Sequence, residues 1–178
     1  MSHQFLVPTK EQVAPVNQTI FDNLQKALGF VPNLYATIAY SDTALNTYLQ
    51  LQNAPSSLSK KEREIINLVV SQVNDCQYCL SAHTVLGKMN GLTDEQIIDI
   101  RKGAVPFNDK TNALVSFVQA ATSNKGKVNE ATIDAFFAAG YTQANLVDIL
   151  IVIADKVVMN YLHNITKVAI DFPVAPAL

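Results

Sequence analysis

A stretch near the middle of the chain, from Ser59 to Gly91, constrains the fold more than any other. Ser59 and Glu62 stand three residues apart, the spacing of a helix capping box. Apolar residues then recur at helical spacing, while the charged residues fall on the other side. These apolar residues are Ile65, Ile66, Leu68, Val69, Val70 and Val73. The pattern predicts an amphipathic helix that begins at Ser59.

A second helix follows after a short turn. Asn74 and Asp75 are typical of a turn and also of a helix N-cap, so we expect the second helix to run from about Cys76 to Asn90. Asn90 and Gly91 both tolerate the left-handed conformation that ends helices. The whole stretch therefore predicts a hairpin of two antiparallel helices.

The hairpin contains both cysteines of the chain in the pattern Glu-x11-Cys-x2-Cys-x3-His, formed by Glu64, Cys76, Cys79 and His83. Positions i, i+3 and i+7 of a helix share an arc of about 60°, so the cysteines and His83 lie on one face. Glu64 and His83 both lie about 13–15 Å from the turn, at about 1.5 Å per residue. We therefore expect all four side chains to converge.

This set of side chains favours thiol redox chemistry. Two cysteines three apart on a helix have Cα atoms about 5 Å apart, within the range of a disulfide. A helix N-terminus favours a thiolate, His83 can take the thiol proton, and Glu64 can hold the other ring nitrogen. A thiolate beside a second thiol attacks an electrophilic oxygen or sulfur, and the neighbour closes a disulfide. The helix dipole favours Cys76 as the attacker and the general base favours Cys79; we favour Cys79.

Two other interpretations of the four residues remain open. Glu64, Cys76, Cys79 and His83 are all zinc-ligand types, but structural zinc pairs usually sit on tight turns, and a second Cys/His pair is missing. Alternatively, the cysteines pack as small buried hydrophobes with no reactivity. The matched heights of Glu64 and His83 favour the redox interpretation over both.

At these four positions the chain resembles the active-site signature of the alkyl hydroperoxidase D-type (AhpD-like) proteins of the carboxymuconolactone decarboxylase superfamily. The segment 28–34, Leu-Gly-Phe-Val-Pro-Asn-Leu, resembles the peroxidase-related branch of that superfamily. So do Asn160-Tyr161 and the segment 171–173, Asp-Phe-Pro. The resemblance thus covers most of the chain.

The resemblance implies an all-α fold, a homo-oligomer (trimer or hexamer), and a thiol peroxidase or disulfide reductase. It assigns Cys79 as the peroxide-reactive cysteine, Cys76 as the resolving one, and Glu64 and His83 as a proton relay. It also implies recycling by dihydrolipoamide or a lipoyl protein, and electron transfer to a peroxiredoxin. One position departs from the pattern: the best-known member has a histidine just before its second cysteine, where this chain has Tyr78.

The composition limits the other possibilities. Hydrophobic residues make up 49% of the chain and charged residues only 16%, which favours a subunit interface. The net charge of −2 gives no reason to expect nucleic acid or an acidic membrane as a partner. We expect no signal peptide, and the apolar segment 146–162 is too short and too charged to span a bilayer. A Cys-x2-Cys without an export signal is typical of a reducing cytoplasm.

The remaining segments predict further helices and no strands, with residues 1–16 as a loose arm. The expected N-caps are Asn17, Ser41, Thr93, Asn129 and Thr142. The last and longest helix, from Thr142 to about Ile170, has apolar residues around much of its circumference, which predicts burial between the hairpin and a neighbouring subunit. Asn160 and His163 near its end line the pocket, cap the helix or contact a subunit. We expect one all-α domain, 1–178, organised on the hairpin.

Taken together, these features predict a cytoplasmic oxidoreductase without cofactor or metal, an alkyl hydroperoxide reductase-like peroxidase. Three alternatives remain. The first is a disulfide-relay protein that serves a lipoyl or peroxiredoxin partner. The second is a non-redox protein of the carboxymuconolactone decarboxylase type, although that chemistry needs no pair of thiols. The third is a zinc-stabilised interaction module.

Overall fold

The computed structural model describes residues 5–178, and in this part of the chain all regular structure is helical. The all-α prediction is therefore confirmed. A short 3-10 helix, η1, spans Lys10–Gln12. The α-helices are α1 (Pro15–Leu28), α2 (Asn33–Ile38), α3 (Ala44–Gln52), α4 (Lys60–Val73), α5 (Gln77–Met89), α6 (Asp94–Lys102), α7 (Asp109–Ser123), α8 (Glu130–Ala138) and α9 (Gln143–Thr166).

Most helix boundaries follow the local capping residues. Capping boxes begin α4 at Ser59, α6 at Thr93 and α9 at Thr142. Gly29 and Gly103, with φ angles of 85° and 78°, end α1 and α6 in the left-handed conformation that glycine adopts without strain.

Three predicted boundaries outside the hairpin are wrong. Helix α1 begins at Pro15 rather than after Asn17, because proline suits the first helical position. The Asn17 side chain instead donates hydrogen bonds to the backbone oxygens of Ala39 and Ser41, at 3.1 and 3.0 Å. Helix α3 has Thr43 rather than Ser41 at its N-cap, and α9 ends at Thr166. Residues 1–4 of the predicted arm lie outside the described residues.

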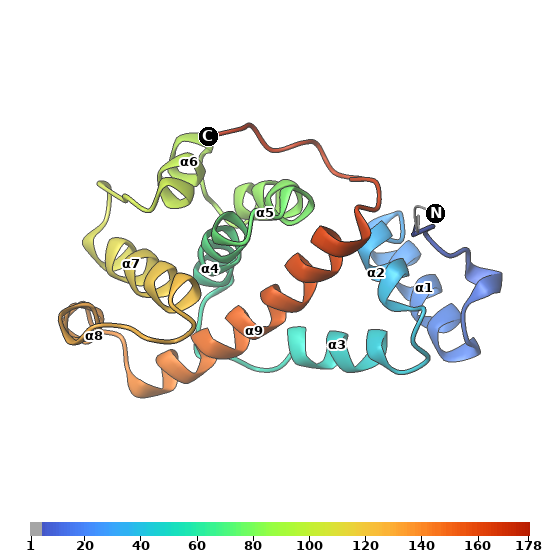
Figure 1. The fold of residues 1–178 in the computed structure, drawn as a ribbon, viewed down its shortest axis with the longest axis horizontal. Helices are drawn as coiled ribbons and strands as arrows, with labels where there is room; N and C mark the ends of the chain where they lie inside the picture. The colour runs from blue at the N-terminus through green and yellow to red at the C-terminus, as the bar shows by residue number, and fades with distance from the viewer. Residues whose placement is uncertain (1–4) are drawn as a thin grey trace.

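Helices α4 and α9 organise the structure (Figure 1). Helix α4 packs against α5, α6, α7 and α9, and α9 also contacts α2, α3 and α5. Helix α9 runs diagonally across the molecule, with α1–α3 towards one of its ends and α7 and α8 towards the other. The α4–α5 hairpin lies beside the middle of α9 and thus between these two groups.

The buried apolar residues form two clusters. The larger one joins α4, α6, α7, α8 and the first half of α9. The second joins α1, α2 and α3 to the start of α5 and the end of α9, and it includes Cys76, Tyr78, Cys79, Met159 and Val168. The two cysteines are therefore part of a hydrophobic core.

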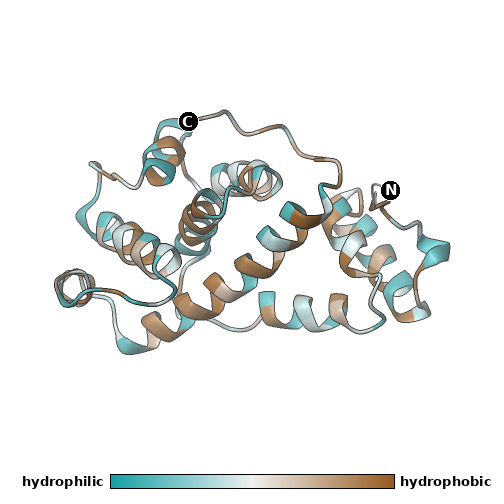
Figure 2. Cartoon of the chain, viewed as in Figure 1, coloured by the Kyte–Doolittle hydropathy of each residue, from teal (hydrophilic) through white to brown (hydrophobic). Residues whose placement is uncertain are grey.

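Within the single chain, helix α9 is buried on one side only. One side carries exposed apolar residues: Val147, Leu150, Ile151, Val158, Tyr161 and Ile165. Figure 2 shows this helix as apolar along much of its length. The opposite, buried side instead includes polar and charged residues: Asp155, Lys156, Asn160 and His163. The predicted packing of this helix against the hairpin is present, and its burial by a neighbouring subunit stays a prediction. The inward polar residues were not predicted, because apolar periodicity cannot show that a helix turns its polar residues inward.

Among the described residues, no single helix is both long and apolar enough to cross a membrane. Helices α8 and α9 pass that test only as a pair, with an angle of 115° between them.

Residues 167–178 form an extended segment, the C-terminal strap, that runs from the end of α9 past α5 towards α6 (Figure 1). The Ser81 hydroxyl accepts a hydrogen bond from the Ala175 amide at 3.0 Å. Gln77 Nε2 donates to the Ala175 oxygen at 2.7 Å, and Arg101 Nη1 donates to the Pro176 oxygen at 2.9 Å. The strap therefore covers the first turns of α5, where the cysteines lie.

Candidate active site

The turn of the hairpin places the two sulfur atoms. Asn74 ends α4, Asp75 takes a left-handed conformation with φ of 51°, and Cys76 is the N-cap of α5. The prediction that Asn74 or Asp75 caps this helix is wrong. The Cys76 sulfur takes the capping role and accepts the backbone N–H of Cys79 at 3.3 Å. This capping hydrogen bond thus links the two cysteines directly.

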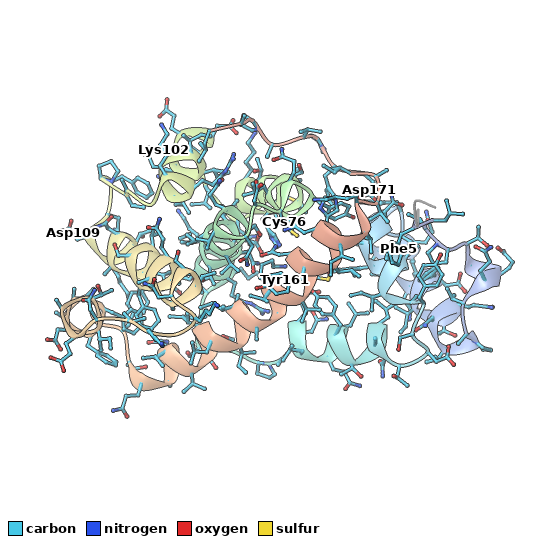
Figure 3. All side chains as sticks on the ribbon, viewed as in Figure 1. Phe5, Cys76, Lys102, Asp109, Tyr161 and Asp171 are labelled. Atoms are coloured by element: carbon cyan, nitrogen blue, oxygen red, sulfur yellow. The ribbon has the colours of Figure 1, made fainter. Side chains whose placement is uncertain are left out.

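Both cysteines are free and buried, with 0% of Cys76 and 3% of Cys79 exposed. They differ in acidity. A hydrogen bond from the Cys76 thiol lowers the pKa of Cys79, and Lys156 and Asn160 lower it further, while burial opposes them. The same hydrogen bond, together with burial, raises the pKa of Cys76. Cys79 is therefore the cysteine that ionises first. Figure 3 shows Cys76 beside α5, facing α9.

Glu64 and His83 face each other as predicted. His83 Nδ1 lies 2.7 Å from Glu64 Oε2, and both side chains are largely buried. Burial would raise the pKa of Glu64, but the charge and hydrogen bond of His83 outweigh it and hold that pKa below its ordinary value. Burial, with a contribution from Lys156, lowers the pKa of His83. The histidine is therefore neutral at neutral pH, with Nδ1–H towards the carboxylate and Nε2 as the basic nitrogen.

The hairpin thus brings the four predicted residues together as two pairs. Cys76 and Cys79 are joined at the start of α5, and Glu64 and His83 are joined between α4 and α5. His83 lies one helical turn after Cys79 on the same face. Within residues 5–178, no hydrogen bond joins the His83 ring to either sulfur, so a proton passes between the pairs through water or after a small side-chain rotation.

Asn160 is close to the site, and His163 has a structural role. The Asn160 amide donates to Ser71 Oγ at 3.2 Å and accepts from Asn74 at 2.9 Å, and it acts to lower the pKa of both thiols. His163 Nε2 lies 3.2 Å from the Val168 oxygen just past the end of α9. Of the three predicted roles, capping fits His163, while Asn160 lies at the hairpin turn beside the cysteines.

Tyr78, which stands where the family pattern has histidine, packs in the core. Its hydroxyl accepts the backbone N–H of Leu34 at 3.3 Å. Its ring contacts Phe172 edge-on and His163 at a tilt, with centroids 5.7 and 5.3 Å away. Burial raises the pKa of Tyr78 far above its ordinary value, so this phenol is not a proton donor of ordinary acidity.

Asp155 and Lys156 were missed as site residues. In the sequence, these two residues only add charge to an apolar segment. In the structure, each is only 3% exposed. Lys156 Nζ lies 4.0 Å from Asp155 Oδ2, and its charge acts on Cys79, Glu64 and Tyr35. Adjacent charges inside an otherwise apolar helix are the one feature that marks them, because a buried charge is rare without a partner or a function.

In the described part of the chain, no group of three or more histidine, cysteine, aspartate or glutamate side chains is placed to hold a metal ion.

The profile of the carboxymuconolactone decarboxylase family matches residues 41–123, which include the hairpin and all four predicted site residues. A comparison with curated proteins found no match.

Solved structures share the fold over nearly the whole chain. A peroxidase-related protein of Silicibacter sp. TM1040 is 24% identical with a TM-score of 0.80, covering 94% of this chain and 93% of that one. A peroxidase-related protein with an alkylhydroperoxidase AhpD core, from Ralstonia eutropha JMP134, is 21% identical with a TM-score of 0.85, covering 94% and 92%. The debrominase Bmp8, solved in complex with 2,3,4-tribromopyrrole, is 18% identical with a TM-score of 0.79, covering 96% and 94%.

The fold and the site define a class of all-α proteins that bury a pair of cysteines at the turn of a helical hairpin. Within that class, residues 41–123 of the chain match the model of the carboxymuconolactone decarboxylase family, and the chain shares its fold with the solved AhpD-core and peroxidase-related structures.

Proposed function

We propose that this protein is a thiol-dependent peroxidase that reduces alkyl hydroperoxides through Cys79 and Cys76. The observation that carries the proposal is the unequal pair of buried thiols, in which Cys76 hydrogen-bonds Cys79 and lowers its pKa. The Glu64–His83 pair on the same hairpin supports it. Together they form a nucleophile, a resolving thiol, a base and a group that orients the base.

The reaction has two steps. The Cys79 thiolate attacks the terminal oxygen of the hydroperoxide; an S–O bond forms, the O–O bond breaks, and the alkoxide leaves as an alcohol after it takes a proton. Cys76 then loses its proton and attacks the Cys79 sulfenic acid; an S–S bond forms and water leaves. Two electrons from a dithiol reductant return the pair to its starting state. Dihydrolipoamide or a lipoyl protein is the proposed reductant, and a peroxiredoxin is the proposed acceptor of electrons from the dithiol.

His83 and Glu64 move the protons. His83 Nε2 takes the Cys79 proton and returns it to the leaving alkoxide. Glu64 fixes the tautomer by accepting from Nδ1–H and stabilises the imidazolium when it forms. The sulfurs lie in the apolar cluster of α1–α3, which favours an apolar organic hydroperoxide over a charged substrate.

The burial of both cysteines also bears on the relay alternative. A partner protein's disulfide must touch the attacking sulfur, whereas 3% of Cys79 and none of Cys76 is exposed. A small hydroperoxide needs only a narrow path. The closed site therefore favours a small electrophile over a protein disulfide as the first oxidant.

Several broader properties belong to the same proposal. The exposed apolar side of α9 supports a homo-oligomer, a trimer or hexamer, in which this side is covered by another subunit. We also propose that residues 1–178 form one domain and that the protein works in the cytoplasm, where reductants regenerate the dithiol. Light scattering on the purified protein measures the subunit number directly.

A thiol count tests the central proposal. The full-length protein is reduced, freed of reductant without oxygen, and its thiols are counted in denaturant before and after one equivalent of cumene hydroperoxide. We expect both thiols to disappear without crosslinked dimers. With Cys76→Ser, Cys79 should stop at a sulfenic acid that dimedone traps. With Cys79→Ser, the remaining thiol should survive.

Two results would overturn the proposal. The first is a Cys79→Ser variant that still reduces the hydroperoxide at the wild-type rate. The second is a wild-type protein that keeps both thiols in excess hydroperoxide but loses them to a lipoyl disulfide or to 2,3,4-tribromopyrrole. That outcome would assign the dithiol to relay or to dehalogenation instead.

A further inference from the structure

Helix α9 carries a buried charged pair on the side that faces the two cysteines of the hairpin. Asp155 and Lys156 are each 3% exposed, although aspartate and lysine are seldom buried. The distance of 4.0 Å between Lys156 Nζ and Asp155 Oδ2 is too long for a hydrogen bond, and Asp155 Oδ1 has no hydrogen-bond partner among the described residues. The carboxylate therefore compensates the ammonium only partly, and its charge acts on neighbouring groups.

Helix geometry shows where the ammonium lies. Val152, Lys156 and Asn160 follow one another at intervals of four, so they form one line along the buried side of α9. Asn160 anchors that line at the hairpin turn, because it hydrogen-bonds Ser71 and Asn74. Lys156 therefore stands one helical turn before the residue that contacts the hairpin turn, and its charge acts on both Glu64 and His83.

Asp155 points to a different neighbour. Its carboxylate lies beside the Tyr48 hydroxyl of α3 and, together with burial, raises the pKa of that tyrosine. The Tyr48 hydroxyl accepts from Gln52 Nε2 at 3.0 Å, and Gln52 Oε1 accepts from Tyr35 at 2.7 Å. The negative charge of the pair is thus turned towards α3, while the positive charge is turned towards the hairpin.

We propose that Lys156 is a positioning residue of the dithiol: its buried ammonium holds the negative charge on Cys79 and keeps His83 uncharged. The inference rests on the proposed function, because it assigns the attacking sulfur of that reaction. With a fixed lysine as the counter-ion of the thiolate, the imidazolium that forms when His83 takes the Cys79 proton is not needed as the thiolate's counter-ion, so it is free to give that proton to the leaving alkoxide.

The surrounding charges are consistent with this division of roles. The groups that face the ammonium or the Cys79 sulfur are Tyr35 on α2, Tyr48 on α3, Glu64 on α4, Cys76, Tyr78 and His83 on α5 or at its start, and Asp155 on α9. Lys156 lowers the pKa of Cys79 by more than Asp155 raises it. Burial would lower the pKa of Lys156, but Asp155 and Cys79 outweigh it, so the lysine keeps its charge.

The test measures the acidity of each cysteine without any peroxide. The reduced full-length protein is alkylated with iodoacetamide across a range of pH, and tandem mass spectrometry separates Cys79 from Cys76. In Lys156→Met, the midpoint of the Cys79 profile should rise by about one pH unit or more, as expected when a nearby opposite charge is lost. Near neutral pH this slows alkylation about tenfold. The NMR titration midpoint of the His83 ring should rise in the same variant.

Two variants separate charge from structure. Lys156→Arg keeps the charge and should restore the wild-type midpoint. Lys167→Met removes an exposed lysine just past the same helix and should leave it unchanged. An unchanged Cys79 midpoint in folded Lys156→Met would overturn the proposal, as would an arginine variant that shifts as far as the methionine variant.

If Lys156→Met does not fold because it leaves Asp155 charged and unpaired, the double variant Asp155→Asn/Lys156→Met replaces it. The Cys79 midpoint should still rise in the double variant, because the lysine has the larger effect, and an unchanged or lowered midpoint would overturn the proposal. Failure of the proposed function is separate: a wild-type protein that does not react with hydroperoxide would still show the Lys156-dependent alkylation profile.

Discussion

Cys76 and Cys79 are chemically the same side chain three residues apart, and their surroundings make them unequal. The Cys76 sulfur accepts a backbone N–H as the N-cap of α5. Its own thiol donates to Cys79, which stabilises negative charge on the second sulfur and keeps the first protonated. The helix dipole by itself favours ionisation of Cys76. The hydrogen bond, with Lys156, reverses that order.

The first prediction concerns His83. Replacement with alanine removes the proposed base, which would take the Cys79 proton and return it to the alkoxide. We expect kcat/KM for an organic hydroperoxide to fall by about 10²–10⁴-fold. Stopped-flow measurement of thiol loss under pseudo-first-order conditions gives this value. The wild-type rate should rise with pH through a midpoint below 6.5, since the pKa of His83 is lowered from that value, and this limb should be absent in the variant.

His163→Ala is the matched control, because His163 is also a buried histidine but contacts Val168 rather than the Glu64 carboxylate. Its rate and the acid limb of its pH profile should stay close to wild type. Equal losses in the two variants would mean that either substitution disturbs the core, and the proton-transfer role of His83 would have to be abandoned.

At the scale of the element, the site depends on how α4 and α5 begin. Ser59 Oγ accepts the Glu62 N–H at 3.2 Å, and the Glu62 carboxylate accepts the Ser59 N–H at 2.9 Å. This box fixes the start of the helix that presents Glu64 one turn later. We predict that Ser59→Ala lowers the free energy of unfolding by about 1 kcal/mol, the usual cost of a lost N-cap. Urea denaturation followed by circular dichroism measures it.

Lys60→Ala is the control for this prediction, because the exposed Lys60 begins the same helix and alanine suits a helix well. It should change the unfolding free energy by less than about 0.5 kcal/mol. A Ser59→Ala variant as stable as Lys60→Ala would show that tertiary packing alone fixes the start of α4.

Local sequence predicts this hairpin well and α9 poorly, for one physical reason. The Ser59 box and the Glu64–His83 contact involve residues within a single hairpin, so helix geometry alone places them. The direction in which Lys156 points depends instead on how α9 packs against α3 and α4, elements far away in the sequence. Asn17 shows the same limit. Its residue type suggests a helix N-cap, but the helix already begins at Pro15, and the Asn17 side chain donates instead to the backbone of a distant turn.

At the scale of the whole molecule, the site lies where two hydrophobic cores meet along α9. The first half of this helix belongs to the core of α4 and α6–α8, and its end belongs to the core of α1–α3 and the cysteines. The charged pair lies between the two halves. A buried charge inside a continuous core costs several kcal/mol, so the junction of two cores is a place where polar groups from several helices can satisfy one another.

The burial of two histidines makes the stability of the molecule depend on pH. Burial lowers the pKa of His83 and of His163, so the unfolded chain binds protons first as the pH falls below 6.5. Glu64 also has a lowered pKa, and its stabilising contribution, present above 4.5, is lost as the pH falls through its folded value. We predict that the free energy of unfolding decreases from about pH 7 to about pH 5, by up to about 1.4 kcal/mol per pH unit for each histidine.

Urea denaturation at a series of pH values measures this slope in the wild type, in His83→Gln, in His163→Gln and in the double variant. Each single substitution removes one titrating histidine and should flatten the slope. Without His83, burial raises the pKa of Glu64, so the double variant should lose no stability between pH 7 and pH 5. A steep slope that persists in the double variant would contradict the prediction, because the protons taken up on unfolding would then belong to other groups. The separate contribution of His83 matters most, since the burial and nearby Lys156 that keep its ring neutral for catalysis also make the fold sensitive to acid.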